Sequence, residues 1–347
     1  MSEERGESAL WQLTLCRFRE FYRMPEALFW AFVFPIMLAV VLGIAFRNRG
    51  PQKVRVGVEA GPGADSLVAA LRASADVTPV PMSAADAARE LRAGRVVLVV
   101  APGSPVTYRY DSTRTESRIA RFATDDVLQR AFGRRDARTV VDRRVTETGS
   151  RYIDFLIPGL IGMNLMGAGM WGVGFALVQN RTRKLIKRLV ASPMRRWHYL
   201  ASYMCVRLAL VPIESGAIVG FGAWAFGVPV RGNLAALLGV ALLGSFCFSS
   251  LGLLVASRAQ TVEAVAGLMN VVMLPMWFLS GVFFSAANFP DAMQPFIRAL
   301  PLTALADALR AMMIDGASLV SQSGEIAIVA LWGVVSFSVA VRIFRWL

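Results

Sequence analysis

The chain has 347 residues, of which 55% are hydrophobic and only 18% charged, and its mean hydropathy is +0.51. An average soluble domain carries about 25% charged residues, so this composition excludes an ordinary soluble globular protein. The net charge of +13 would indicate a nucleic-acid ligand in a soluble protein, but in a membrane protein it must first be divided between the two sides of the bilayer. Arginine supplies nearly all of the basic residues, which we interpret as GC-rich codon use in a bacterium.

Six segments are long and apolar enough to cross a bilayer. A spanning helix needs about 20 apolar residues, because about 30 Å of hydrocarbon is crossed at 1.5 Å per residue. The segments are 27–46, 155–179, 199–226, 232–257, 264–284 and 322–344. We therefore expect a polytopic α-helical membrane protein with about six transmembrane helices. The first segment also resembles the core of a signal peptide, but its length and the long stretch before it favour an uncleaved span.

Lysine and arginine in the short loops predict the orientation. Segment 180–198 contains seven basic residues and no acidic residue, so we place it in the cytoplasm. The same side receives both ends of the chain and Arg258, which brings its basic residues to fourteen, against Arg231, Arg298 and Arg310 on the other side. We therefore expect both termini to be cytoplasmic, in a bacterial inner membrane.

Two polar regions accompany the spans near the N-terminus. In residues 1–25 we expect an interfacial helix, because Trp11, Leu15, Phe18 and Tyr22 recur at helical spacing. The first span follows at 26–46, and Pro25 ends the helix before it.

Residues 47–151 form a separate polar region, in which we expect an extracytoplasmic α/β domain with strands at 54–59 and 95–100 and helices at 64–75 and 84–93. This region has a net charge of +7. Its arginines are either a surface for anionic lipid, cell wall or a partner, or simply a solvated helix face. No acidic pair or nucleophile cluster in it indicates catalysis.

The remaining segment, 152–347, contains five spans and a second unusual element. The stretch 288–316 is too apolar for a free loop and too interrupted by proline to span. We expect it to form a re-entrant or interfacial element on the outer side.

The second span is rich in glycine, at positions that include Gly167, Gly169, Gly172 and Gly174. Residues 167–172 formally match the dinucleotide-binding pattern G-x-G-x-x-G, but that pattern requires a preceding strand. Within a membrane span, small residues instead allow close approach of helix backbones. We therefore expect this span to pack against another helix or a second copy of the chain.

Arg207 and Glu214 are ionisable residues inside the third expected span. They are seven residues apart, about two turns, so they lie on one face of a helix. Intramembrane charges are functional candidates by default, which makes this pair a candidate polar site that lines a substrate path or gate. Alternatively, Arg207 extends to the membrane surface and a neighbouring helix satisfies Glu214.

Cysteine and histidine are too few to build a metal site. Cys16, Cys205 and Cys247 lie in apolar or amphipathic segments, which excludes a disulfide framework. His198 is the single histidine and cannot form a histidine-ligated site by itself. The phosphate-binding pattern G-x-x-x-x-G-K-[ST] is absent from the sequence. We therefore expect no metal, no cofactor and no ATPase activity in this chain.

Four segments, in this order, resemble the membrane subunit of ABC transporters of the type-2 exporter class, the ABC-2 permeases. They are Arg-Met-Pro-Glu-Ala-Leu-Phe-Trp-Ala-Phe-Val-Phe-Pro-Ile-Met at 23–37, Phe-Leu-Ile-Pro-Gly at 155–159, the basic run 181–188 that leads to Ala-Ser-Pro-Met-Arg at 191–195, and Leu-Pro-Leu-Thr-Ala-Leu-Ala-Asp-Ala-Leu-Arg at 300–310. The resemblance covers essentially the whole chain.

This resemblance implies two permease copies, identical or related, with two ATP-binding subunits docked on the cytoplasmic side, where ATP and magnesium are used. The N-terminal helix would be the connecting helix, and 181–189 the coupling helix that transmits motion from the ATPase. The residues that would couple to the ATPase are Arg181, Arg183, Lys184, Lys187 and Arg188. Many members have acidic residues and a Gly-Thr step at this position, whereas this chain has Arg-Lys-Leu-Ile-Lys.

The sequence therefore predicts a permease subunit of an ATP-driven exporter for a hydrophobic or amphiphilic substrate. The alternative is a membrane-anchored sensor or assembly scaffold whose outer domain binds a ligand. A membrane-embedded hydrolase lacks its sequence motifs, and a secondary transporter would be expected to show internal repeats, which this chain does not show.

Overall fold

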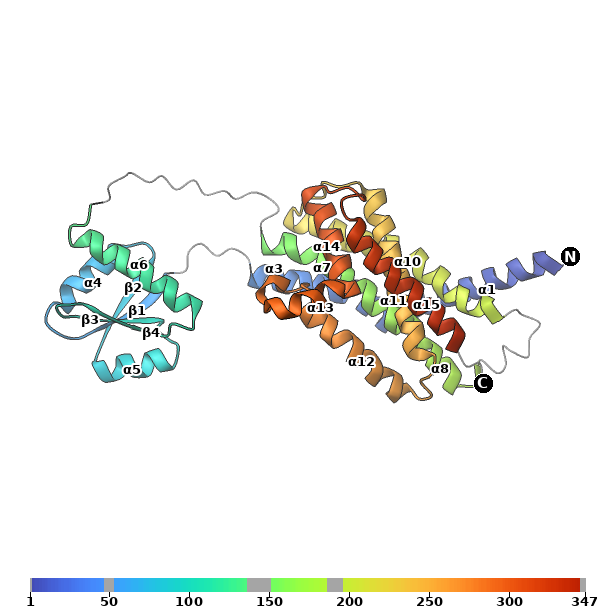
Figure 1. Cartoon of the computed structure of the whole chain (residues 1–347), viewed down its shortest axis with the longest axis horizontal. Helices are drawn as coiled ribbons and strands as arrows, with labels where there is room; N and C mark the ends of the chain where they lie inside the picture. The colour runs from blue at the N-terminus through green and yellow to red at the C-terminus, as the bar shows by residue number, and fades with distance from the viewer. Residues whose placement is uncertain (1, 47–52, 136–150, 186–195, 344–347) are drawn as a thin grey trace. The chain divides into compact units, whose positions relative to one another are not determined.

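The computed structural model describes residues 2–46, 53–135, 151–185 and 196–343. The chain forms two compact units (Figure 1). The helical unit comprises Met1–Arg47 and Thr146–Leu347, and the small unit comprises Asn48–Val145.

The helical unit begins with α1 (Ser2–Arg23), which lies within the expected range 1–25. Met24 then takes an extended conformation, with φ of −100° and ψ of 99°, directly before Pro25. Helices α2 (Pro25–Leu28), η1 (Phe29–Val33) and α3 (Phe34–Ala45) follow without a break and together make the first span. The proline therefore separates the amphipathic helix from the apolar one.

The other spans follow the small unit. They are α7 (Tyr152–Gly169) with η2 (Met170–Phe175) and α8 (Ala176–Thr182), then α10 (Arg196–Phe226), α11 (Leu234–Ala256), α12 (Val262–Leu279) and α15 (Ser323–Ile343). Between α12 and α15 lie the short helices η3 (Ala286–Asn288), η4 (Asp291–Met293), α13 (Gln294–Ala299), α14 (Pro301–Arg310) and η5 (Ala311–Asp315). Among the described residues, six helices have the length and composition of membrane spans. The expected fold class is thereby confirmed.

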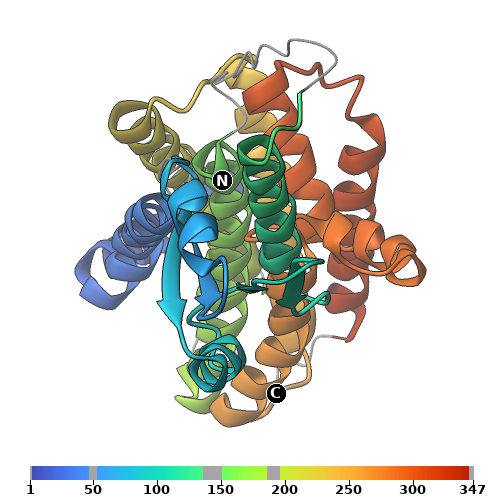
Figure 2. The ribbon, with the colours of Figure 1, turned by 90° about the vertical axis from the view of Figure 1, so that its left-hand side faces the viewer.

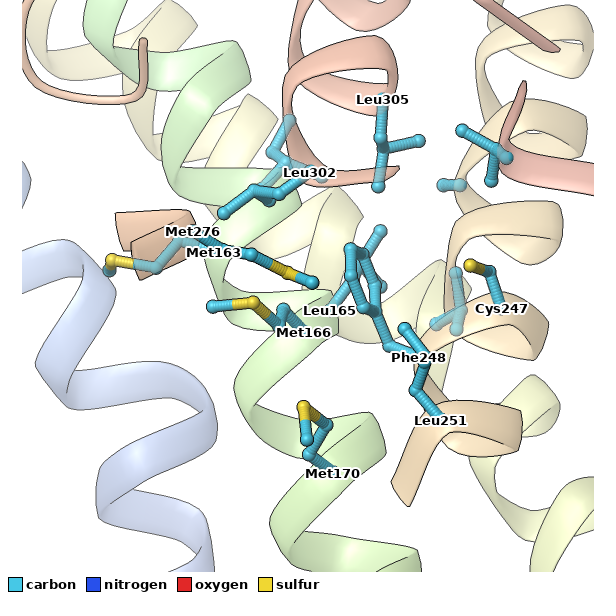
Figure 3. Close-up of a cluster of buried hydrophobic side chains, with 14 of the residues drawn as sticks. Met163, Leu165, Met166, Met170, Cys247, Phe248, Leu251, Met276, Leu302 and Leu305 are labelled. Carbon is cyan, nitrogen blue, oxygen red and sulfur yellow. The ribbon is translucent and has the colours of Figure 1, made fainter. Parts of the chain in front are cut away.

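The core of the helical unit lies where α7, α11 and α14 meet. Met163 and Met166 of α7 lie beside Phe248 of α11 and Leu302 and Leu305 of α14 in Figure 3, and all five are buried. Helix α7 is apolar all round because it is surrounded by protein, whereas a helix at the surface of the unit has only one stripe facing its neighbours.

Helix α14 lies within the predicted segment 288–316. It packs against α7, α11 and α15, and all but its Asp307 and Arg310 side chains are buried. The preceding turn ends at Leu300, which is extended, and Pro301 opens the helix at a position where its missing N–H costs nothing. The element is thus a short helix that contributes to the core rather than a surface loop.

The small unit contains a four-stranded sheet in the order β2-β1-β3-β4. Strands β1 (Val54–Glu59), β2 (Val77–Met82) and β3 (Leu98–Ala101) are parallel, and β4 (Thr107–Tyr110) pairs antiparallel with β3. The sequence pattern did not predict β2 or β4. Strand β2 contains Pro79 and Pro81, which cannot donate to a ladder, and its place at the edge of the sheet explains how they are tolerated.

Helices cover both faces of this sheet. Helices α4 (Ala64–Arg72) and α6 (Thr115–Ala131) contact each other on one face, and α5 (Ala84–Arg92) packs on β1 and β3 from the other (Figures 1 and 2). Tyr108 of β4 donates a hydrogen bond to Asp125 of α6 over 3.1 Å. Burial, together with this bond, raises the pKa of Tyr108 to about 12, so the hydroxyl remains a donor throughout the physiological range.

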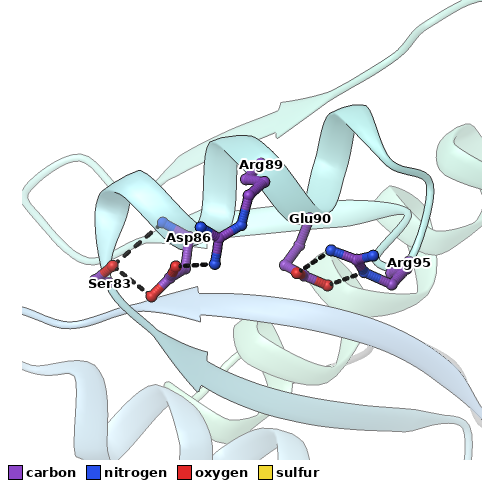
Figure 4. A network of polar contacts seen from close by, with 5 residues as sticks. All are labelled: Ser83, Asp86, Arg89, Glu90 and Arg95. Carbon is purple, nitrogen blue, oxygen red and sulfur yellow. Dashed lines mark hydrogen bonds and ion pairs between the residues drawn. The ribbon is translucent and has the colours of Figure 1, made fainter.

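Local polar contacts define α5 (Figure 4). Ser83 caps the helix by accepting from the Asp86 amide over 3.2 Å, and Asp86 in turn pairs with Arg89 over 2.5 Å. After the last turn, Arg95 donates two hydrogen bonds to Glu90, which lower the pKa of that carboxyl group. These pairs are exposed, so they orient the helix ends rather than contribute much to stability.

The small unit is inserted between two neighbouring helix ends of the helical unit. Phe46 follows α3 and Tyr152 begins α7, and their ring centroids lie 4.3 Å apart. The insertion therefore leaves the packing of α3 on α7 intact.

Candidate functional site

The helical unit contains a buried polar network that links α7 to α10. Arg207 and Glu214 form a bidentate ion pair in which Nη1 donates to Oε1 over 2.7 Å and Nη2 donates to Oε2. The exposed fraction of Arg207 is 5% and that of Glu214 is 0%. Asn164 of α7 donates to the same Oε2 over 3.3 Å. Both charges are thus enclosed by protein, and Arg207 does not extend to a surface.

The helix between the two charges contains Pro212, which has no N–H to donate to the preceding turn. Removing charges from water costs several kcal/mol per ion, which only good geometry and additional hydrogen bonds offset. The bidentate contact and the Asn164 amide supply these. Asn164 was not among the predicted site residues, although an isolated amide in the otherwise apolar run 155–178 is a signal that could have identified it.

The four predicted packing glycines divide into two pairs. A Cβ on Gly169 would lie 2.9 Å from Phe248 Cβ and from the Ser249 amide nitrogen, and one on Gly174 would collide with the Gly252 carbonyl. These two glycines therefore allow α7 and η2 to approach α11 closely. A Cβ on Gly167 or Gly172 would meet no atom within 4 Å, so this second pair makes no comparable contact in the part of the chain that the structure describes.

A second polar cluster ties α1 to the start of α10. The Arg17 guanidinium lies over the Tyr203 ring, 3.4 Å from its centroid, and its Nε donates to the Ser202 hydroxyl over 2.9 Å. Asn180 of α8 donates to the Tyr203 hydroxyl over 2.6 Å and to that of Tyr199 over 3.3 Å. One cluster therefore connects α1, α8 and α10. The sequence pattern predicted the helix α1 but not this contact, because its partner residues lie more than 160 positions away.

Arg181, Arg183 and Lys184, three of the five predicted coupling residues, lie at the same end of the helical unit, which we call the α8 end. Arg181 is half-buried and donates to the carbonyl oxygens of Ala256 and Ala259, over 3.1 and 2.7 Å, so its guanidinium holds the end of α11. Arg183 and Lys184 follow α8 and are exposed, and Lys184 has a φ of +58°. Lys187 and Arg188 lie outside the described residues.

A third contact joins the start of α7 to the end of α14. Arg310 lies over the Phe155 ring, 3.8 Å from its centroid, and donates to Asp307 over 2.6 Å and to the Gly281 carbonyl over 3.1 Å. Asp154, with no exposed surface, pairs with Arg151 over 2.8 Å. Among the described residues, no group of three histidine, cysteine, aspartate or glutamate side chains is placed to hold a metal ion.

Among the described residues, six apolar helices of spanning length with a buried ion pair in their interior define a polytopic membrane protein. The family model described as "ABC-2 family transporter protein" matches residues 25–342. The chain therefore belongs to the ABC-2 permease family, as its sequence motifs predicted.

Curated relatives are similar to this chain at low identity. A probable multidrug ABC transporter permease of Escherichia coli, YbhR, is 23% identical over 165 residues, which are 48% of this chain and 45% of that protein. Nodulation protein J of Bradyrhizobium diazoefficiens is 24% identical over 201 residues, 57% of this chain and 75% of that protein. ABC transporter G family member 20 of Dictyostelium discoideum is 23% identical over 182 residues, 52% of this chain and 25% of that protein. The matches to the permease and the Dictyostelium protein thus span less than half of those proteins.

The buried ion pair yields a stability prediction. Replacing Glu214 by Gln or Arg207 by Met leaves one charge without its partner inside the protein, so we expect each single variant to lose about 3–5 kcal/mol of stability. The double variant Arg207→Met, Glu214→Leu removes both charges and is expected to lose less than the sum of the single losses. Thermal unfolding of the purified chain in detergent measures this coupling, and additive losses would show that the two side chains act independently.

Proposed function

We propose that this ABC-2 permease is the membrane half of an ATP-driven exporter, and that it moves a hydrophobic or amphiphilic substrate outward between two copies of the chain. The observation that carries this proposal is the family match across the helical unit. The named relatives support transport, since YbhR carries the description of a probable multidrug permease. The spans are apolar and their charges are enclosed, so the exposed helix faces suit a substrate that enters from lipid.

In this proposal ATP and magnesium are bound by a separate ATP-binding subunit at the α8 end. Membership of the ABC-2 family implies such a partner, and the absence of a phosphate-binding loop in the sequence is consistent with it. Exposed Arg183 and Lys184 supply positive charge for an acidic docking surface. The segment that includes Lys187 and Arg188 extends the same basic run.

Movement at this docking surface has a direct route into the spans. The cluster of Arg17, Asn180, Tyr199, Ser202 and Tyr203 ties α1 and α8 to the start of α10. We propose that α1 and α8 shift together when the partner moves, and that α10 follows them. The Arg207–Glu214 pair then carries the shift from α10 to α7 through Asn164.

Charge reversal at the α8 end tests the docking surface. We expect the amount of ATP-binding subunit that co-purifies with the double variant Arg183→Glu, Lys184→Glu to fall at least about tenfold. The introduced carboxylates would repel an acidic docking surface that the native cations attract. ATP-dependent export into inverted vesicles should fall in parallel. The matched control is Arg118→Glu, Arg298→Glu, which changes the net charge equally at exposed positions outside the α8 end. If the wild-type chain never co-isolates with an ATP-binding subunit, the proposed function is wrong.

We propose that the α8 end faces the cytoplasm and that the small unit lies outside, as the fourteen basic residues predict. Single cysteines test this orientation in a chain whose three native cysteines are replaced by alanine. In intact cells, a membrane-impermeant maleimide should label Ala85→Cys in α5 but not Arg258→Cys. Both positions are exposed, so the opposite labelling pattern would reverse the topology.

We propose that a second copy covers the exposed face of α12. This face carries Gly267, Asn270, Val271 and Leu274 at helical spacing, all exposed. An amide that faces hydrocarbon lacks a hydrogen-bond partner and is costly, so Asn270 indicates protein cover. Helix α12 contacts η2, where Gly172 is also exposed, and small residues of this kind permit close helix approach.

Cross-linking distinguishes this face from one that contacts lipid. With the native cysteines replaced, Asn270→Cys should give dimers with a short bismaleimide in membranes. The control Leu331→Cys on α15, which is also exposed, has only apolar side chains one turn away on either side and should remain monomeric. Equal cross-linking at the two positions, or none at position 270, would contradict the proposed interface.

A further inference from the structure

The small unit contains a pocket that the transport proposal does not use. Its volume is about 290 Å³, and it is lined by the end of α5, the end of β4 and the start of α6. The lining residues are Leu91, Arg92, Tyr110, Asp111, Arg114 and Ser117. A pocket of this size accommodates a small polar molecule rather than a drug-sized ligand.

One wall of the pocket is the start of α6, a helix of 17 residues. Arg114 occupies its N-cap position, and no side chain caps the helix. The amides of its first turn have no partner within the helix and attract a negative group. Ser117 lies in this first turn with only 1% of its surface exposed. Its hydroxyl has no hydrogen-bond partner among the described residues, although it lines the pocket.

Two guanidinium groups converge on the same space. Arg92 ends α5 and Arg114 is the N-cap of α6, and both line the pocket. The charge of Arg114 also acts on Asp111 across the pocket lining. The Arg114 side chain passes over Gly94, where a Cβ would lie 3.2 Å from its Nη1. Gly94 also has a φ of +69°, so glycine is suited to this position both by backbone conformation and by the space that the guanidinium needs.

The pocket also contains one carboxylate. Asp111 accepts hydrogen bonds from the Thr113 amide, over 2.9 Å, and from the Thr113 hydroxyl, over 2.6 Å, and both end on Oδ1. These bonds lower the pKa of Asp111, so the group is ionised at neutral pH. Its Oδ2 remains available. The lining therefore carries two positive charges and one negative charge.

We propose that this pocket binds a small zwitterion that bears a phosphate group and an ammonium group. The phosphate lies between Arg92, Arg114 and the first turn of α6, where guanidinium forks and helix amides both suit its oxygens. The ammonium lies against Asp111 Oδ2 and the Tyr110 ring. A phosphate with two negative charges and one ammonium complements the charges of the lining. Ethanolamine phosphate is the simplest molecule of this class, and an ethanolamine lipid headgroup carries the same two groups with one negative charge on its phosphodiester.

Calorimetric titration of the purified full-length chain in a maltoside detergent tests the site. Ethanolamine phosphate should bind saturably, and more tightly than inorganic phosphate, which lacks the ammonium, or ethanolamine, which lacks the phosphate. Arg114→Ala should weaken binding at least about tenfold, since a hydrogen bond to a charged group contributes about 1.5–3 kcal/mol. Asp111→Asn keeps the Oδ1 acceptor but removes the negative charge. This variant should bind ethanolamine phosphate no more tightly than inorganic phosphate.

The matched control is Arg118→Ala, which removes the same charge from an exposed position one turn along α6 and should bind like the wild type. Equal affinities of Arg114→Ala and wild type, equal weakening by Arg118→Ala, or no saturable binding by the wild type would each overturn the proposal. Tighter binding of glycerophosphoethanolamine than of ethanolamine phosphate would identify a lipid headgroup as the natural ligand. Tighter binding of ethanolamine phosphate would identify a soluble metabolite instead. The titration needs no ATP-binding partner, so its outcome is independent of the transport function.

Discussion

Hydrocarbon offers no hydrogen-bond partner to a polar group, and the helical unit is arranged around this constraint. Each span satisfies its own backbone as a helix. The ionisable side chains in the interior of the unit are enclosed in contacts with one another or with carbonyl oxygens, as in the pair of Arg207 with Glu214 and the bonds of Arg310 to Asp307 and Gly281. Asn164 of α7 and the Gly281 carbonyl after α12 extend these contacts to neighbouring segments.

These polar contacts sit at three levels along the bundle and suggest how movement is transmitted. The Arg17 cluster joins three helices at the α8 end, the Arg207–Glu214 pair joins two in the interior, and Arg310 joins two at the opposite end. Between these levels the contacts are apolar and close, as at Gly169 against α11. Such contacts favour the movement of connected rigid segments over the movement of independent helices.

The small unit is not subject to this constraint, because water can supply hydrogen-bond partners to its polar surface. Its sheet tolerates Pro79 and Pro81 only because β2 is an edge strand, and several of its ion pairs are local to one helix, as around α5. The pocket near Arg114 differs in that it gathers two cations, one carboxylate and the buried Ser117 around one concave space. The basic charge of this unit therefore includes a specific concave feature as well as a solvated helix face.

The sequence by itself determined the six spans, their family and the presence of an inserted α/β unit, because span length, hydropathy and helical periodicity are local properties of the chain. It also indicated that Arg207 and Glu214 share a face, since seven residues make two turns. Only the tertiary structure decided which glycines pack within the chain, that Asn164 joins the ion pair, and that Arg17 meets Tyr203. Those contacts join residues far apart in sequence, and nothing in a local pattern specifies which helices become neighbours.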